Sequence, residues 1–216
     1  MLFDKINFGI AWGEKFDLKA LSHRSAVVAG TFNNWNLSAG ASMIGDKLYS
    51  ETIWGIVGGK QIKERLILGV SIMVYDLKIK QYGQDTSVGI NLGWRAGLNE
   101  NISWFGSLRN INAPTIGQSN ELLPQVISSG LLYDPSEKLN LIVEWEQETL
   151  YESRIKFGGQ FMLMPWFGVF TGHASSPGQL TLGFNVDFKN IKINYAFSTH
   201  SYLDISHYMG VGITLR

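Results

Sequence analysis

Apolar residues alternate with small or polar ones along most of the chain. In 86–98, valine, isoleucine, leucine, tryptophan and alanine take every second position, with mostly serine, glycine, asparagine and arginine between them. Because successive side chains of a strand point to opposite faces, this period of two predicts a strand with one apolar face. Segments 179–188 and 191–198 repeat the pattern, and no stretch has convincing helical spacing, so we predict an all-β fold. Three candidate strands leave the apolar face undecided: 20–32, 51–60 and 123–133.

The connections between these segments come in two lengths that alternate along the chain. Short turns are expected near 33–34, 61–64, 99–101, 134–138, 164–165 and 189–190. Longer polar connections are expected at 13–18, 45–50, 77–85, 110–122, 147–152, 173–178 and 199–204. Outer-membrane barrels have short periplasmic turns and longer extracellular loops, whereas a Greek-key sandwich lacks this rhythm. The pattern therefore predicts a closed antiparallel up-and-down transmembrane β-barrel of about fourteen strands.

The length of the chain suits one such barrel. Fourteen strands of about 9–11 residues use about 140 residues, and the chain has 216. We therefore expect residues 1–216 to form a single barrel domain with no separate plug. The longest apolar run, 161–170, is too short for a membrane-spanning helix of about 20 residues. The N-terminus shows no export signal, so we expect a mature terminus or a fragment.

Composition excludes several classes of partner. Eighteen basic and eighteen acidic residues give a formal net charge of zero, and they form no block of like charge. Nucleic acid is therefore not an expected partner. The chain has no cysteine, and His23 and His173 are isolated in the sequence, so no metal site and no cofactor are expected.

In a barrel, the alternation assigns side chains to lipid or to the lumen. The apolar positions are predicted to face lipid: Val88, Ile90, Leu92, Trp94, Leu180, Leu182, Phe184, Val186, Ile193, Tyr195, Met209, Val211 and Ile213. The polar positions are predicted to line the lumen: Arg65, Asn91, Arg95, Arg109, Asn140, Glu144, Glu146, Arg154, Lys156, Gln160, Asn185, Asp187, Lys192 and Asn194. A lining with both signs of charge either tunes an aqueous path or fills the barrel with ion pairs, and parity alone leaves both readings open.

A resemblance to a known family rests on the second half of the chain. The segments that carry it are Leu123-Pro-Gln-Val-Ile127, Tyr133-Asp-Pro135, Phe157-Gly-Gly-Gln-Phe161, Pro165-Trp166, Ser176-Pro-Gly178 and the closing stretch from Ile193 to His207. They resemble the PorV/PorQ-type proteins, a branch of the FadL-like outer-membrane barrels. The resemblance implies fourteen strands and either transport of hydrophobic molecules or partnership with a type IX secretion machine. The chain departs from the family by entering a strand almost at once, at Ile6, and by ending in Arg216 rather than an aromatic residue.

One group of residues could suggest catalysis. His200, Asp204, Ser206 and His207 include the residue types of a nucleophilic triad. Residues so close on one loop and strand start rarely converge, so we expect them to order the loop and to form hydrogen bonds at the rim. The protein is predicted not to be an enzyme.

These observations favour a non-enzymatic barrel in the bacterial outer membrane that transports small molecules or acts as a secretion-system partner. Its expected partners are membrane lipids or detergent, with a small hydrophobic ligand or envelope proteins as further candidates. Two alternatives remain at this stage. One is an outer-membrane lipid hydrolase or acyltransferase that uses His200 or His207. The other is a soluble β-barrel binding protein, in which the apolar faces would form a core.

Overall fold

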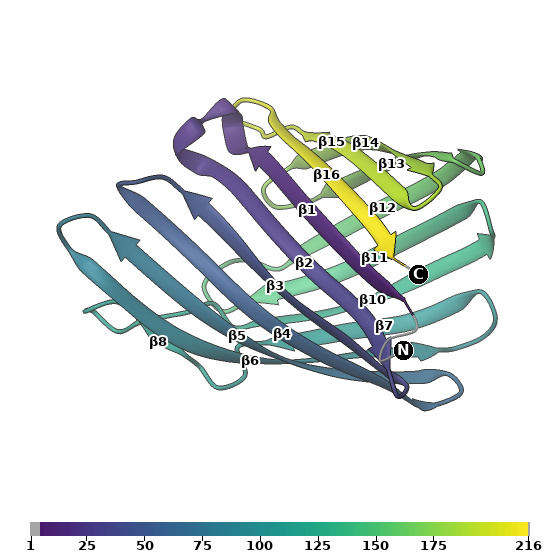
Figure 1. The fold of residues 1–216 in the computed structure, drawn as a ribbon, viewed down its shortest axis with the longest axis horizontal. Helices are drawn as coiled ribbons and strands as arrows, with labels where there is room; N and C mark the ends of the chain where they lie inside the picture. Colours follow the sequence, from purple (N-terminus) through teal and green to yellow (C-terminus); the bar gives the residue numbers. More distant parts are fainter. Residues whose placement is uncertain (1–4, 216) are drawn as a thin grey trace.

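Residues 5–215, which the computed structural model describes, form a closed barrel of fourteen antiparallel strands (Figure 1). The strands are β1 (Ile6–Glu14), β2 (Ser22–Phe32), β3 (Trp35–Gly45), β4 (Tyr49–Lys63), β5 (Leu66–Ile79), β6 (Gly83–Gly97), β7 (Ile102–Arg109), β10 (Val126–Ser136), β11 (Leu139–Glu148), β12 (Arg154–Met164), β13 (Phe167–Ala174), β14 (Gln179–Phe188), β15 (Ile191–Ser198) and β16 (Ser206–Leu215). Each strand pairs with the next along the chain, β7 pairs with β10, and β1 pairs with β16 to close the barrel. The predicted fold class is confirmed.

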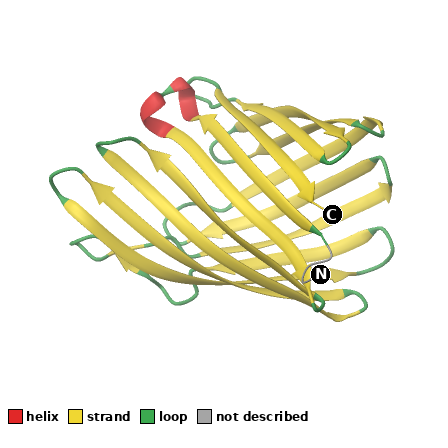
Figure 2. Ribbon diagram, in the orientation of Figure 1, coloured by secondary structure: helices red, strands yellow, loops and turns green. Residues whose placement is uncertain are grey.

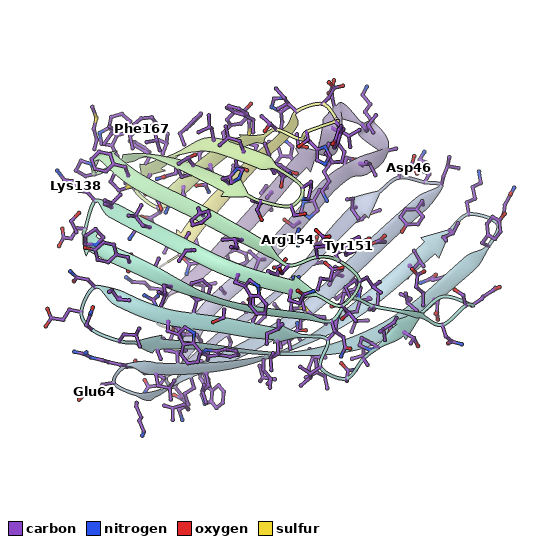
Figure 3. The ribbon with its side chains drawn as sticks, turned by 180° about the vertical axis from the view of Figure 1, so that it is seen from behind. Asp46, Glu64, Lys138, Tyr151, Arg154 and Phe167 are labelled. Atoms are coloured by element: carbon purple, nitrogen blue, oxygen red, sulfur yellow. The ribbon has the colours of Figure 1, made fainter. Side chains whose placement is uncertain are left out.

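The connections between strands define two different ends of the barrel. The start of β1, the end of β16 and the two-residue turns, such as those at 33–34 and 189–190, lie at one end, which we call the short-turn end (Figure 1). Glu64, Lys138 and Phe167 lie near this end and Asp46 lies at the other, which we call the loop end (Figure 3). Two 3-10 turns, η1 (Lys15–Asp17) and η2 (Lys19–Leu21), join β1 to β2 at the loop end (Figure 2). In residues 5–215, no helix is long and apolar enough to cross a membrane.

Two of the predicted long connections are wrong. The connections expected at 45–50 and 77–85 are only 46–48 and 80–82, because β4, β5 and β6 continue for 15, 14 and 15 residues. The backbone ladder does not require apolar side chains, so at the strand ends Asp76 of β5 pairs with Thr86 of β6, and Lys78 pairs with Gln84. The wall is consequently taller there than at β7, β13 and β15, which have eight residues each.

The pairing register gives every strand a consistent inner and outer face. Directly opposite residues share a face, and the register can be followed through all fourteen pairings without a conflict. One face carries large exposed apolar side chains, such as Ile56 at 67% and Trp54 at 55%. The buried small and polar side chains, such as Ser71 and Asn185, lie on the other face, which also carries apolar residues of β4 and β5. In a closed cylinder the sheltered face is the inner one, so the apolar faces form the outer surface rather than a core.

Glycines on the inner face make room for aromatic rings of the neighbouring strand. A Cβ on Gly183 would lie 2.3 Å from the ring of Phe170 and 2.5 Å from the carbonyl oxygen of Tyr195. Gly130 is covered in the same way by the ring of Phe105. These rings shield glycine backbone that carries no side chain of its own, which stabilises the ladder.

Replacing Gly183 by valine is expected to lower the free energy of unfolding by about 1–3 kcal/mol, since the added carbons displace an aromatic ring and press on backbone. Denaturant unfolding followed by tryptophan fluorescence measures the change. Gly93→Val is the matched control, because a Cβ at this inner-face glycine would meet only the Gly106 carbonyl oxygen, at 3.8 Å. Equal stability of the two variants would contradict the packing argument.

Candidate functional site

Five charged side chains meet on the inner face of β7, β11 and β12. They are Arg109, Glu144, Glu146, Arg154 and Lys156, and we call them the lumen charge cluster. Arg154 lies directly opposite Glu146 in the register, and Lys156 lies opposite Glu144. This placement follows from the alternation, since residues two apart on each strand point to the same side.

Glu146 is the centre of the lumen charge cluster. Its carboxylate accepts hydrogen bonds from Lys156 Nζ at 2.7 Å, Arg154 Nε at 2.6 Å and Arg109 Nη2 at 3.3 Å. Only 4% of Glu146 is exposed. Glu144 makes a single, longer contact of 3.4 Å with Lys156. One nearly buried carboxylate therefore holds three cations that are themselves partly exposed to the lumen.

The register places the other predicted lumen residues on the inner face as well. Asp187 and Lys192 form an ion pair of 3.5 Å between β14 and β15, and Arg95 lies 3.9 Å from Asp134. Arg65 lies in the turn between β4 and β5, with its aliphatic carbons against the inner side of Gly97. The remaining ones are Asn91, Asn140, Gln160, Asn185 and Asn194. The residues predicted to face lipid all lie on the outer face: Val88, Ile90, Leu92, Trp94, Leu180, Leu182, Phe184, Val186, Ile193, Tyr195, Met209, Val211 and Ile213.

Open space lies beside the inner face. Val27 of β2, Val57 of β4 and Ile142 of β11 face inward, yet 48%, 36% and 39% of these residues are exposed. An inward side chain remains exposed only where the opposite wall does not reach it. The ion pairs therefore line the lumen without filling it. Apolar side chains dominate the inner face of β4 and β5, whereas charges dominate that of β11 and β12, so the lumen has a mixed lining.

The connection between β7 and β10 folds inward at the loop end. We call residues 110–125 the inturned loop; it contains the small hairpin of β8 (Thr115–Ile116) and β9 (Glu121–Leu122). The loop is anchored by Asn110, which is 5% exposed. The side chain of Asn110 accepts a hydrogen bond from Tyr75 Oη at 2.9 Å and donates one to the Pro124 carbonyl at 2.8 Å. A cavity of about 340 Å³ separates the loop from the inner wall and from Tyr151. The inturned loop therefore narrows the mouth.

The same loop completes the wall beside β6. The ladder between β6 and β7 covers only Leu92–Gly97 on β6, so the segment 83–91 lacks a strand partner on that side. The side chain of Asn112 substitutes for a strand: its amide donates to the Val88 carbonyl at 2.7 Å, and its oxygen accepts from Ile90 N–H at 2.9 Å. Gly117 N–H also donates to Asp85 of β6.

Sequence reasoning missed the roles of Asn110 and Asn112. The available signal was the Asn-Ile-Asn triplet directly after a strand. Asparagine tolerates the left-handed backbone conformation, and Asn110 adopts it with φ of 54°. Such a triplet marks a change of chain direction, but it does not say which strand the amides will reach.

The four residues of the catalytic hypothesis do not assemble into a triad. Ser206 faces inward and His207 outward, because they are neighbours on β16. Ser206 Oγ accepts from the Phe16 N–H at 3.0 Å, whereas His207 Nδ1 contacts Tyr195 Oη at 2.9 Å. His200 packs edge-on against Phe16, with ring centres 5.2 Å apart.

The two contacts of Phe16 hold His200 of the loop before β16, and Ser206 at the start of β16, against the η1 turn. Asp204 lies exposed in that loop. His23 contacts Ser42 Oγ and His173 lies on the outer face of β13. In the part of the chain that the structure describes, no three histidine or acidic residues are arranged to hold a metal ion.

Comparison with known proteins adds the fold-level relationship. The sequence matches no protein-family model, and no curated protein is similar to it in sequence. Solved barrels match its structure over nearly the whole chain. The fold is that of channel and porin barrels.

Three of these structures illustrate the likeness. The toluene transporter TodX of Pseudomonas putida superposes with a TM-score of 0.66 at 10% identity, over 97% of this chain and 88% of that chain. The monoaromatic hydrocarbon channel CymD gives 0.65 at 10% identity, over 97% and 87%. The KdgM porin gives 0.56 at 10% identity, over 97% and 99%. At such low identity the likeness concerns the fold, and the PorV/PorQ and FadL resemblance stays a prediction.

Proposed function

We propose that this protein is a non-enzymatic channel of the bacterial outer membrane, a single barrel without a separate plug that passes small molecules through its lumen. The observation that carries the proposal is the open, mixed inner lining inside a closed barrel whose outer face is apolar. The likeness to channel and porin barrels supports it. Membrane lipid is then the medium of the outer face.

The apolar band on the outer face supports a membrane location. On β5, Leu66, Leu68, Val70, Ile72 and Val74 face outward in succession before Asp76 ends the series. The eight residue steps from Leu66 to Val74 span about 26 Å along the strand, or about 20 Å at a tilt of about 40°. That height approaches the apolar band of about 25 Å in outer-membrane barrels.

The lining favours small molecules that have both an apolar and a polar part. The apolar inner wall of β4 and β5 would accept a hydrocarbon portion, and the lumen charge cluster would accept a polar group through Arg109 or Lys156. Named neighbours that carry toluene or monoaromatic hydrocarbons make an apolar solute reasonable. No contact in the described residues favours a secretion partner over transport, so that role stays a prediction.

The test is conductance in planar bilayers, with a tryptophan placed in the lumen. Gly59 faces inward, and a Cβ there would meet only Leu68 oxygen at 3.6 Å and Gly69 Cα at 4.0 Å. Gly59→Trp is expected to lower single-channel conductance, because the ring occupies the lumen. Gly58→Trp is the matched control, since Gly58 is next to Gly59 in the sequence but faces outward, where a side chain also has room.

The control should conduct like the unmodified protein. Folding of each variant is checked by its shift in mobility on a gel with and without boiling. A folded protein that conducts nothing, and that passes no small solute into liposomes, would refute the channel.

A further inference from the structure

The outer surface carries a basic groove at the loop end. The groove has a volume of about 730 Å³ and is lined by Lys19, Arg24, Lys47 and Lys78 together with Glu14 and Asp46. Its charged residues come from β1, η2, β2, the turn between β3 and β4, and β5. Side chains from five separate elements therefore converge on one place.

The groove opens to the surroundings of the barrel and not to its lumen. Arg24 lies opposite Trp12 on one side and Met43 on the other, and Lys78 lies opposite Ser50. These residues share the parity of the exposed outer side chains. The groove thus lies directly beside Trp12, above the apolar surface.

The cations of the groove are available to a ligand. Within the described residues, Lys19, Arg24, Lys47 and Lys78 have no carboxylate within 4.0 Å, unlike the cations of the lumen charge cluster. Asp46 is occupied by its own turn, where its carboxylate accepts from the N–H groups of Leu48 and Tyr49 at 2.8 and 3.2 Å. These hydrogen bonds hold the pKa of Asp46 below its usual value. Four cations against two carboxylates leave the groove positive.

A shallow apolar valley continues from the groove toward the short-turn end. One register row crosses the outer face as Ile10, Ala26, Ala41 and Trp54. The two alanines lie between an isoleucine that is 56% exposed and a tryptophan that is 55% exposed. In the next row, Phe8 and Ile56 form the ridges, and Val28 and Ala39 lie between them. The four strands set the ridges about 14 Å apart, which is wide enough for hydrocarbon chains.

We propose that the basic groove and the alanine valley together bind a lipid whose headgroup carries phosphate. The phosphates contact Arg24, Lys47, Lys78 and Lys19, and the acyl chains lie along Ala26 and Ala41 between the two ridges. Charge complementarity selects an anionic headgroup, and the adjoining valley selects an amphiphile over a free anion. The inference rests on the membrane location in the proposed function, because only there is the outer face in contact with lipid.

The experiment measures lipid retention by the purified full-length protein in detergent, using native mass spectrometry and bisphosphorylated lipid A as the probe. The triple variant Arg24→Gln, Lys47→Gln, Lys78→Gln is expected to bind the probe at least about tenfold more weakly, since three charge-assisted contacts are lost. Ala41→Trp, which fills the valley and keeps every charge, should also weaken binding. Lipid A that lacks its phosphates should bind the unmodified protein weakly. Its affinity should be as low as that of the bisphosphorylated probe for the triple variant.

The matched control is Lys60→Gln, Lys138→Gln, Lys189→Gln, which removes the same charge near the short-turn end. It should retain the probe like the unmodified protein. Unchanged retention by the folded triple variant would overturn the proposal, as would equal binding of the phosphate-free lipid. Full competition by inorganic phosphate would also overturn it, because the site would then be a plain anion site. Conductance in bilayers without lipid A distinguishes the lipid site from the channel. A protein that binds the lipid but conducts no current would refute only the channel.

Discussion

Replacing Glu146 by alanine is expected to lower the free energy of unfolding by about 2–3 kcal/mol. Removing one partner of a buried ion pair costs about 3–5 kcal/mol. The loss should be smaller here, because Arg109, Arg154 and Lys156 are between 33% and 49% exposed and can turn toward lumen water. Denaturant unfolding in detergent or lipid vesicles measures the change.

The same substitution should change ion selectivity. The lumen charge cluster has three cations and two carboxylates, and Glu146→Ala leaves three cations against one carboxylate. Repulsion of cations and attraction of anions by the uncompensated charge should shift the reversal potential in a salt gradient toward anion preference. The shift should shrink at high salt, because screening lengths fall to about 3 Å at 1 M.

Glu144→Ala is the matched control for stability. It removes the same kind of side chain from the same strand and face, but Glu144 makes only the 3.4 Å contact with Lys156. We expect a loss of less than about 1 kcal/mol, as for partly exposed ion pairs. Because both variants remove one carboxylate, they should shift selectivity in the same direction. Equal stability of the two variants would show that Glu146 does not hold the cluster together.

Replacing Asn110 by glycine is expected to release the inturned loop and to raise the conductance. Glycine tolerates the φ of 54° at this position, so the substitution tests the side chain without adding backbone strain. It removes the bonds to Tyr75 Oη and to the Pro124 carbonyl, at an expected cost of about 1–3 kcal/mol. Each 1.4 kcal/mol raises the population of the released loop about tenfold. Single-channel recordings should show a larger conductance with more frequent fluctuations.

Asn99→Gly is the corresponding control at the other end of the barrel. Its side chain also makes two hydrogen bonds, to the N–H groups of Asn101 and Ile102, but it lies in the turn between β6 and β7. Conductance should not change. Limited proteolysis between residues 113 and 123 provides a second readout, since a released loop is cut faster. A variant at Asn110 with normal conductance and normal protease resistance would show that the loop is held by other contacts.

The amino-acid sequence by itself determined the class of fold and the face of most side chains. A strict period of two separates two faces whatever the strand pairs with, so Leu92 and Asn91 could be assigned to opposite sides in advance. The alternation of turn lengths then indicated an up-and-down path. In such a barrel successive connections lie at opposite ends, and the connections at one end are short while those at the other are longer. Where two apolar residues are adjacent, as at Val27 and Val28, the alternation does not show which of them faces outward. The pairing register determines it.

Only the tertiary structure decided features that depend on residues far apart in the sequence. The ends of β4, β5 and β6 are polar and look like loops, but their backbone groups find partners across the ladder. Glu146 of β11 contacts Arg109 of β7 because only one strand, β10, separates these two strands in the barrel. Asn110 contacts Tyr75 because the inturned loop bends into the mouth of the barrel. The basic groove combines charged side chains of five elements that are separated by up to 64 residues, from Glu14 to Lys78. Alternation along one strand defines a face, whereas a site requires the closure and register that set which faces meet.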